Sequence, residues 1–332
     1  MPVAEKLRRW EVFSHCSDAQ LGRLAACLSG ARYPAGTRVV EHGADTRDAY
    51  VVDRGRIAIL RPTSYGPFRF ATLGPGDVFG ETSFVDGGGR TGDAVAEEDC
   101  ELFALSPVAF SALTEGDTKV ELALYWAFWK SLSGKLRRTN ERLARFFSEP
   151  GVAEAVRRDA AGPPPARGDF RVELGDKRKL FEEQRLSNLE INFLTSLSRE
   201  LELAPSEVVF REGEEGDAMY VVLRGRVMIS KLIAGAGEEA LAFLERGDYF
   251  GEMALIDRVP RSADAQAGEE GAVVLAIPRD VLAGILDIGK PSSLRLLKLL
   301  CSLVARRLRE LDEKIVGWFM LAGGDHGPGG EA

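Results

Sequence analysis

The chain has 332 residues, of which 45% are hydrophobic and 28% charged, and its formal net charge is −8. This is ordinary for a globular protein of about two domains, and the negative charge argues against a nucleic-acid interface, which normally needs a basic face. The N-terminal MPVAEKLRRW has no apolar signal-peptide core, and no uncharged apolar run approaches the roughly 18 residues of a membrane span, so we expect a cytoplasmic protein that contacts neither DNA nor a membrane.

The first half of the chain opens with a short helical pattern and continues with short strands. Ser17 and Asp18 precede the apolar residues Leu21, Leu24 and Leu28, and serine and aspartate are favoured at helix N-caps. Strand-like runs follow at 38–41, 50–53, 56–61, 69–73 and 100–105, separated by glycine-rich turns. Many short strands between turns indicate a β-sandwich or barrel.

A linker and a tail divide the rest of the chain. Residues 150–169 are rich in proline, glycine and alanine and read as an extended linker, and residues 323–332 read as a disordered tail. The predicted domains are therefore 1–149 and 170–322. The second opens like the first, because Ser187 and Asn188 precede another apolar helical pattern.

A long helix is predicted at the end of each domain. Apolar residues recur at spacings of three and four in both, which favours helix-to-helix pairing, whereas a stripe that only covers its own β-domain is the alternative. The two patterns share an offset of 172 residues, so we expect an intramolecular pseudo-dimer rather than a homodimer. The predicted seam joins Tyr125, Trp129, Leu132, Leu136, Leu143 and Phe146 to Leu297, Cys301, Val304, Leu308, Ile315 and Trp318.

An internal repeat underlies this organisation. Tyr50-Val51-Val52 aligns with Tyr220-Val221-Val222, and Arg54-Gly55-Arg56 aligns with Arg224-Gly225-Arg226, both at an offset of 170 residues. The offset becomes 171 further along the chain. Two copies of this length are tandem domains rather than a solenoid.

Each copy also carries the motif Gly-Asp-x-Phe-Gly-Glu, with an arginine ten residues after the second glycine. The first motif begins at Gly76 and the second at Gly247. A tight glycine turn before a short helical turn leaves backbone N–H groups without partners, and these can bind an anion. The glutamate can accept hydrogen bonds from a sugar diol, and the arginine offers a planar fork to a phosphate. The motif therefore predicts anion capture.

The motif resembles the phosphate-binding cassette of the cyclic nucleotide-binding domain family. The second copy matches the family pattern throughout FGEMALIDRVPRSA. The resemblance implies an α+β fold, with two tandem jelly-roll β-rolls that are each followed by a long helix. It also implies that Glu252 holds the ribose 2′-hydroxyl, and that Arg261 and the backbone near Gly251 and Ala254 hold the cyclic phosphate. The predicted second site is Phe250, Gly251, Glu252, Ala254, Arg261 and Ser262.

The first copy departs from the family pattern at two points. Ser83 replaces an alanine, and three glycines at 87–89, which cost entropy to order, precede the arginine. The predicted first site is Phe79, Gly80, Glu81, Ser83, Arg90 and Thr91. Asp53 stands where some kinase regulatory domains carry an aspartate that orients the arginine; a solvated turn residue is the alternative.

The base is predicted from the residue after each cassette arginine. In the family a threonine there often accompanies guanine, and a serine is compatible with adenine. This chain has Thr91 in one copy and Ser262 in the other. We expect cyclic AMP rather than cyclic GMP, although both hydroxyls can equally just cap the cassette.

Catalysis is not expected. The three histidines, His15, His42 and His326, are scattered, the four cysteines show no CxxC spacing, and no nucleophile–base constellation is visible. We therefore predict no catalytic residue, metal or cofactor.

The expected output is signalling through a partner protein. Arg157-Arg158-Asp159-Ala160 resembles the pseudosubstrate of kinase regulatory subunits, which makes a kinase one candidate partner, although solvated linker charge is the simpler interpretation. Little chain follows the last helix, so no helix-turn-helix is expected. The alternatives are a structural protein with vestigial pockets and an inhibitor similar to a kinase regulatory subunit.

Overall fold

The computed structural model describes residues 1–115, 117–147, 198–233, 237–253, 259–285 and 291–321. They fall into two compact units. The first comprises Met1–Leu136 and Ile288–Ala332, and the second comprises Arg137–Asp287. Several predictions concern residues outside the described ones: the 150–169 linker, the 323–332 tail, the helix start at Ser187, the Arg157–Ala160 segment and Ala254 of the second cassette.

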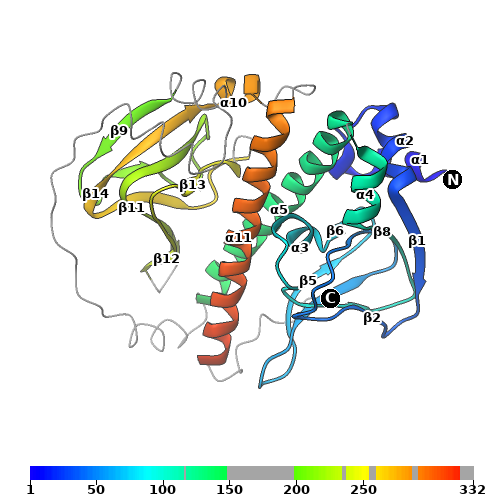
Figure 1. Cartoon of the computed structure of the whole chain (residues 1–332). Helices are drawn as coiled ribbons and strands as arrows, with labels where there is room; N and C mark the ends of the chain where they lie inside the picture. Colours follow the sequence, from blue (N-terminus) through cyan, green and yellow to red (C-terminus); the bar gives the residue numbers. More distant parts are fainter. Residues whose placement is uncertain (116, 148–197, 234–236, 254–258, 286–290, 322–332) are drawn as a thin grey trace. The chain divides into compact units, whose positions relative to one another are not determined.

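The first unit contains a β-roll made of two four-stranded antiparallel sheets, with strand orders β1-β8-β3-β6 and β2-β7-β4-β5 (Figure 1). Their inward faces form one core that includes Val52, Ile57 and Leu102. The five predicted strands are confirmed. Three strands were missed, β1, β6 and β7. The strands are β1 Leu28–Tyr33, β2 Arg38–Val40, β3 Ala49–Arg54, β4 Ile57–Arg61, β5 Phe68–Leu73, β6 Val78–Phe79, β7 Asp93–Ala96 and β8 Cys100–Leu105.

Helices cover the first roll. The predicted N-cap is confirmed, because the Ser17 hydroxyl accepts from the Gln20 N–H at 3.4 Å while the Gln20 side chain accepts from the Ser17 N–H at 2.8 Å. In the long helix α5, the side chains of Leu122, Trp129 and Leu132 are completely buried. The helices are α1 Val3–Arg9, η1 Glu11–Phe13, α2 Asp18–Cys27, α3 Glu81–Asp86, α4 Pro107–Thr114 and α5 Thr118–Phe147.

The last helix among the described residues, α11 (Pro291–Leu321), belongs to the first unit, although it follows the second copy in sequence. It contacts α5: the Cys301 thiol donates to the Tyr125 carbonyl at 3.3 Å, and the Lys298 ammonium lies 2.5 Å from Glu121. Further along, the Phe319 ring lies 5.0 Å from Phe68 of β5. The two long helices therefore meet through Tyr125 and Cys301 of the predicted seam. The pairing of the other seam residues stays a prediction, and the side chains of Leu143 and Phe146 are outside the described part.

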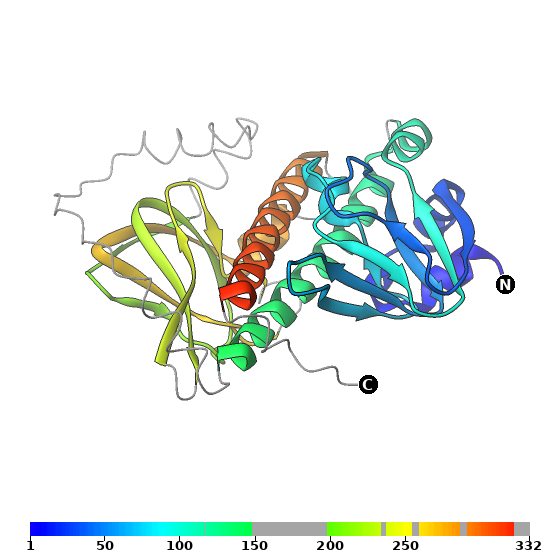
Figure 2. The same ribbon diagram turned by 90° about the horizontal axis from the view of Figure 1, so that it is seen from below.

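The second unit contains a six-stranded antiparallel sheet, in which β10, β14, β11 and β12 lie in order, β13 pairs with β11 and β9 pairs with β14. Figure 2 shows these strands in yellow-green to gold. Its long strands β11 and β14 bury Val221, Val222 and Val274 completely. The elements are β9 Arg199–Leu203, β10 Val208–Phe210, β11 Ala218–Ile233, β12 Gly237–Leu244, β13 Tyr249–Phe250, β14 Asp264–Pro278 and α10 Arg279–Ile285. The end of α5, from Arg137, also belongs to this unit.

The central glycine of the repeated Arg-Gly-Arg segment is required in both copies. Gly55 and Gly225 have φ angles of +88° and +72°. A Cβ on Gly225 would lie 2.3 Å from the Gly271 carbonyl oxygen, and one on Gly55 would lie 2.6 Å from the Cys100 sulfur. Both positions therefore require glycine for conformation and for space.

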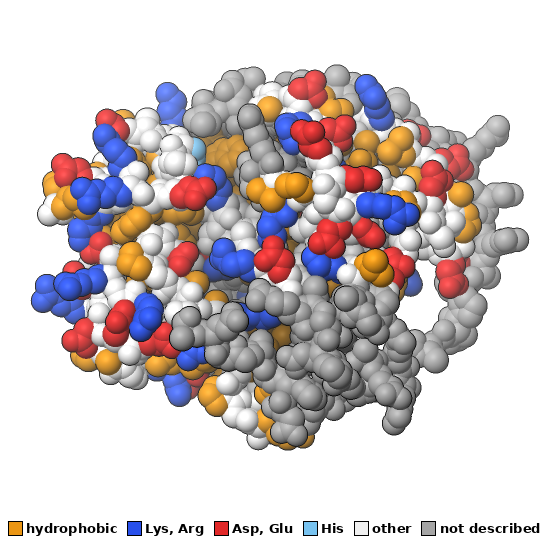
Figure 3. All heavy atoms as spheres, turned by 180° about the vertical axis from the view of Figure 1, so that it is seen from behind, with side chains coloured by type: hydrophobic (Ala, Val, Ile, Leu, Met, Phe, Trp, Pro, Cys, Tyr) orange, Lys and Arg blue, Asp and Glu red, His pale blue; other side chains and the backbone are white. Residues whose placement is uncertain are grey.

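The surface carries charges of both signs. On the face in Figure 3, lysine and arginine side chains are interspersed with aspartate and glutamate side chains. No helix among the described residues combines the length and apolar character that a membrane span requires.

Candidate functional site

The glycine turn of each cassette is built around its arginine. Gly80 and Gly251 adopt φ angles of +79° and +76°. A Cβ at Gly80 would lie 2.5 Å from Arg90 Nη1, and a Cβ at Gly251 would lie 2.6 Å from Arg261 Nη1. Only glycine lets each guanidinium pack directly against the turn.

Arg90 is buried, with 4% of its surface exposed, and backbone oxygens hold its guanidinium. Nη1 donates to the Gly80 carbonyl at 3.1 Å, Nη2 to the Asp48 carbonyl at 2.7 Å and Nε to the Thr46 hydroxyl at 3.0 Å. Burial lowers the pKa of Arg90, and the nearby side chains of Tyr50, Asp48 and Glu81 partly offset this shift. The arginine is thus a fixed buried cation.

Arg261 repeats this arrangement in the second copy. Nη1 donates to the Gly251 carbonyl at 2.6 Å and Nη2 to the Ala218 carbonyl at 2.7 Å. The guanidinium carbon also lies 4.2 Å from the centre of the Phe210 ring, which is cation–π distance. Nε is buried and has no hydrogen-bond partner among the described residues. A buried N–H without an acceptor is costly, so this donor is available to an anion.

Stacked aromatic rings support both turns. The ring centres of Tyr50 and Phe79 lie 4.9 Å apart, with an angle of 13° between the ring planes. Those of Tyr220 and Phe250 lie 5.1 Å apart, with an angle of 21°. In both copies the stack joins the strand that carries the tyrosine, β3 or β11, to the two-residue strand that leads into the glycine turn. Phe79 and Phe250, predicted as site residues, therefore act beneath the turn as packing.

The cassette carboxylate of the first copy is held by helix α5. Glu81 is fully buried, and its Oε1 accepts from the Ser131 hydroxyl at 2.9 Å and from the Lys135 ammonium at 2.6 Å. Its Oε2 is buried and has no partner among the described residues. One carboxylate oxygen is thus neutralised within the chain, while the other remains as an acceptor. In the second copy Glu252 is 3% exposed and favours the charged form of Arg261.

The two departures of the first cassette from the family pattern are linked. The Ser83 hydroxyl donates to the Gly89 carbonyl at 3.1 Å, so the serine that replaces alanine holds the last of the three glycines in place.

The residue after each cassette arginine is also held by a basic side chain. In the first copy, the Thr91 carbonyl accepts from Arg61 at 2.6 Å. In the second copy, Lys231 lies 3.4 Å from the equivalent Ser262 carbonyl.

The structure brings together Gly80, Glu81, Ser83 and Arg90 in the first copy, and Gly251, Glu252 and Arg261 in the second. Asp53 does not join them. Its carboxylate pairs with Lys6 of α1, so it is neither the orienting partner of Arg90 nor a solvated turn residue. The Asp48 carbonyl and the Thr46 hydroxyl hold Arg90 instead.

Sequence reasoning missed the residues that reach the first cassette from distant helices, namely Ser131, Lys135 and Arg309. One signal was available for Lys135. It lies three residues after Leu132 and one before Leu136, at the edge of the buried stripe of α5, where a charged side chain needs a specific partner.

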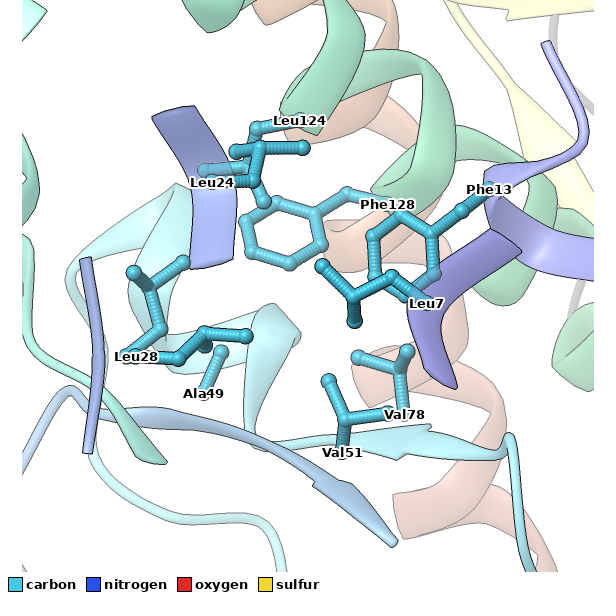
Figure 4. Close-up of a pocket in the computed structure, with 10 residues that line it drawn as sticks. Leu7, Phe13, Leu24, Leu28, Ala49, Val51, Val78, Leu124 and Phe128 are labelled. Carbon is cyan, nitrogen blue, oxygen red and sulfur yellow. The ribbon is translucent and has the colours of Figure 1, made fainter. Parts of the chain in front are cut away.

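A small apolar cavity of about 20 Å³ lies elsewhere in the first unit (Figure 4). Side chains of α1, α2 and α5 meet those of β3 and β6 there, among them Leu7, Val51, Val78 and Phe128. All of its lining side chains are apolar. It is therefore a packing gap beneath the helices, with no group that could hold a phosphate.

Comparison with known proteins points to the same segments. A sequence profile described as a cyclic nucleotide-binding domain matches residues 31–117 and 200–288, which together make up more than half of the chain. These two segments contain both glycine turns and both cassette arginines.

Individual relatives are more distant. The chain is 23% identical over 257 residues to a cAMP-dependent protein kinase regulatory subunit of Yarrowia lipolytica, covering 77% of this chain and 54% of the relative. It is 39% identical over 104 residues to the cyclic AMP receptor protein of Thermus thermophilus, covering 31% and 46%. The chain thus spans about half the length of the curated relatives it matches. Among solved structures, the regulatory domain of Toxoplasma gondii PKA with cAMP aligns over 89% of this chain and 93% of that chain, at 18% identity and a TM-score of 0.32.

Proposed function

We propose, on the premise that this chain belongs to the cyclic nucleotide-binding domain family, that it senses cyclic AMP in one or both cassettes and signals through a partner protein. The observation that carries the proposal is the buried guanidinium of Arg261. It is fixed by two backbone carbonyls and keeps an unpartnered Nε among the described residues. A cyclic phosphate supplies the missing acceptor.

In the second site, Arg261 would hold the phosphate and Glu252 would accept from the ribose 2′-hydroxyl. The turn at Gly251 brings the backbone close to the ligand, and Ala254 and Ser262 complete the proposed set with Phe250 beneath it. Burial strengthens these charge-assisted contacts, because both Arg261 and Glu252 are at least 96% buried.

In the first site, Arg90 would take the phosphate and the free Oε2 of Glu81 the 2′-hydroxyl. Lys135 then stabilises the carboxylate and adds positive charge beside the bound anion. Phe79, Gly80, Ser83 and Thr91 complete this proposed set. The Lys135–Glu81 ion pair also favours one alternative, in which the first pocket is vestigial because its carboxylate already has a partner in the chain.

The preference for cyclic AMP rests on Ser262 in the second site and agrees with the names of two relatives, a cAMP-dependent protein kinase regulatory subunit and a cyclic AMP receptor protein. We propose a protein kinase as the partner, by analogy with the first of these. We also propose that the chain works as a monomer whose two long helices pair internally, with domains at 1–149 and 170–322.

Calorimetric titration of the full chain with cyclic AMP and with cyclic GMP tests this function. The proposal expects saturable binding of both, with cyclic AMP tighter. Tighter binding of cyclic GMP would overturn the assigned base. No binding of either nucleotide would leave the structural protein with vestigial pockets as the better account.

A further inference from the structure

Helix α11 holds the cassette of the first copy through one arginine. Arg309 Nη2 lies 3.1 and 2.9 Å from the two carboxylate oxygens of Asp86, and Nε lies 3.2 Å from Oδ2. Arg309 Nη1 donates to the Gly89 carbonyl at 2.7 Å. We define residues 87–89 as the glycine loop. One guanidinium therefore binds the residue that precedes this loop, Asp86, and the last residue of the loop, Gly89.

The glycine loop is shaped around this guanidinium. A Cβ on Gly88 would lie 2.8 Å from Arg309 Nη2. The Gly88 N–H donates to Asp86 Oδ1 at 2.8 Å, and Gly87 has a φ of +70°. The sequence suggests a loop that is costly to order. The structure shows the side-chain bonds that order it.

The loop leads directly into Arg90, so its conformation fixes the start of the phosphate-binding residue. On the other side of Arg90, the Thr91 carbonyl accepts from Arg61, and Arg61 pairs with Glu313 of α11. Arg309 and Glu313 are one helical turn apart. Both neighbours of Arg90 are thus held by α11, one directly and the other through Arg61.

The second copy repeats the contact. Arg137 Nη1 on α5 donates to the Pro260 carbonyl at 2.8 Å, and Pro260 precedes Arg261 as Gly89 precedes Arg90. Arg137 and Arg309 are equivalent in the alignment of the two long helices. Each contact lies within one compact unit. In both, the arginine comes from the helix that follows the other copy in sequence.

We propose that Arg309 and Arg137 are positioning residues for nucleotide binding, each acting on the cassette of the opposite copy: Arg309 on Arg90 and Arg137 on Arg261. The inference rests on the proposed function. It adds that each site is completed by a helix from the other copy, so neither β-roll with only its own helix would have a fully ordered cassette.

The test uses the full chain with one site disabled at a time. Arg261→Ala leaves the first site and Arg90→Ala leaves the second. Calorimetry with cyclic AMP then compares Arg309→Met and Arg137→Met in each background. We expect Arg309→Met to weaken the first site about tenfold or more and to leave the second within about twofold. Arg137→Met should do the reverse.

Matched controls separate positioning from a general loss of helix or charge. Arg306→Met and Arg138→Met remove exposed arginines from the same two helices and should leave both sites unchanged. Arg309→Lys should retain only part of the affinity of the first site. The ammonium keeps the positive charge, but it cannot make the forked contact with Asp86 and Gly89 together. Should Arg309→Met fail to fold, Asp86→Asn removes the charged partner without altering α11, and it should weaken the first site alone.

The inference would be overturned if Arg309→Met weakened only the second site or Arg137→Met only the first. It would also be overturned if either variant weakened both sites equally, or if neither variant weakened any site. Failure of the proposed function is a separate result, seen when the unmutated chain binds no cyclic nucleotide. Hydrogen exchange on the ligand-free chain then decides the positioning role. Arg309→Met should speed exchange at the Gly88 and Arg90 amides and Arg306→Met should not, whereas equal exchange in the two variants would overturn it.

Discussion

Lys135 and Glu81 form an ion pair inside the first cassette, with Nζ 2.6 Å from Oε1. The carboxylate is fully buried, whereas 20% of the lysine side chain is exposed. The pair links α5 to the first turn of α3. The residue that would meet the ribose is therefore also a structural partner of the long helix.

Removing only the lysine should destabilise the first unit. Lys135→Met leaves the Glu81 carboxylate buried with Ser131 as its partner, and we expect a loss of about 3 kcal/mol in the free energy of unfolding, at the low end for a broken buried pair because the lysine is partly exposed. The double variant with Glu81→Gln should recover most of this loss. Urea unfolding measures both. Additive losses in the double variant would mean that the two side chains act independently.

Glu252→Gln should distinguish between sugars. The carboxylate is proposed to accept a charge-assisted hydrogen bond from the ribose 2′-hydroxyl. We therefore expect the variant to weaken cyclic AMP about tenfold and to weaken its 2′-deoxy analogue much less. Competition binding in an Arg90→Ala background measures the second site alone. Equal weakening of the two ligands would make Glu252 a structural residue of the turn.

His15 should contribute to stability above about pH 6.5. Burial lowers its pKa, and the nearby Lys130 ammonium adds to this shift. The neutral ring donates Nε2–H to the Ala123 carbonyl at 2.9 Å, which partly offsets the shift, and Nδ1 is buried without a partner among the described residues. With the folded-state pKa below the unfolded one, this contribution is lost as the pH falls through the folded-state value.

The corresponding variant is His15→Gln. Its free energy of unfolding should fall less than that of the unmutated chain between pH 7 and pH 5. Burial also lowers the pKa of His42, so the decline should be reduced rather than abolished. An identical decline in the two proteins would rule out a role for His15.

The thiol of Cys301 should report when α11 leaves α5. Cys301 is fully buried against the Tyr125 carbonyl, and burial raises its pKa well above 9. In a chain without the other three cysteines, alkylation at pH 8 should be far slower than in urea and should follow the opening of the helix pair. A native rate equal to the unfolded rate would contradict the buried contact.

The sequence allowed the local parts of the site to be predicted. The turn at Gly80, the first residue of α3 at Glu81 and the arginine ten residues after the turn depend on neighbours close in the chain, and the repeat gives each prediction a second instance. The strands around them follow from short apolar runs between turns. Residues 50–53 and 100–105, for example, are confirmed as β3 and β8.

The long-range partners could not be predicted in this way. Lys135 is 54 residues from Glu81, and Arg309 is 223 residues from Asp86. Contacts over such separations leave no periodicity in either segment, and a charged residue on a helix usually faces solvent. Asp53 shows the opposite problem, because its position suggested a role beside Arg90 until Lys6 proved to be its partner.

Calorimetric stoichiometry for cyclic AMP tests the central claim most directly. The unmutated chain, Arg90→Ala, Arg261→Ala and the double variant are compared, with circular dichroism to confirm folding, because each arginine also holds backbone carbonyls. Loss of a buried arginine–phosphate contact should weaken its site by about two to four decades. The account predicts one or two sites in the unmutated chain and none in the double variant. Where both cassettes bind, each single variant retains one site. Near-native binding by the double variant would contradict it.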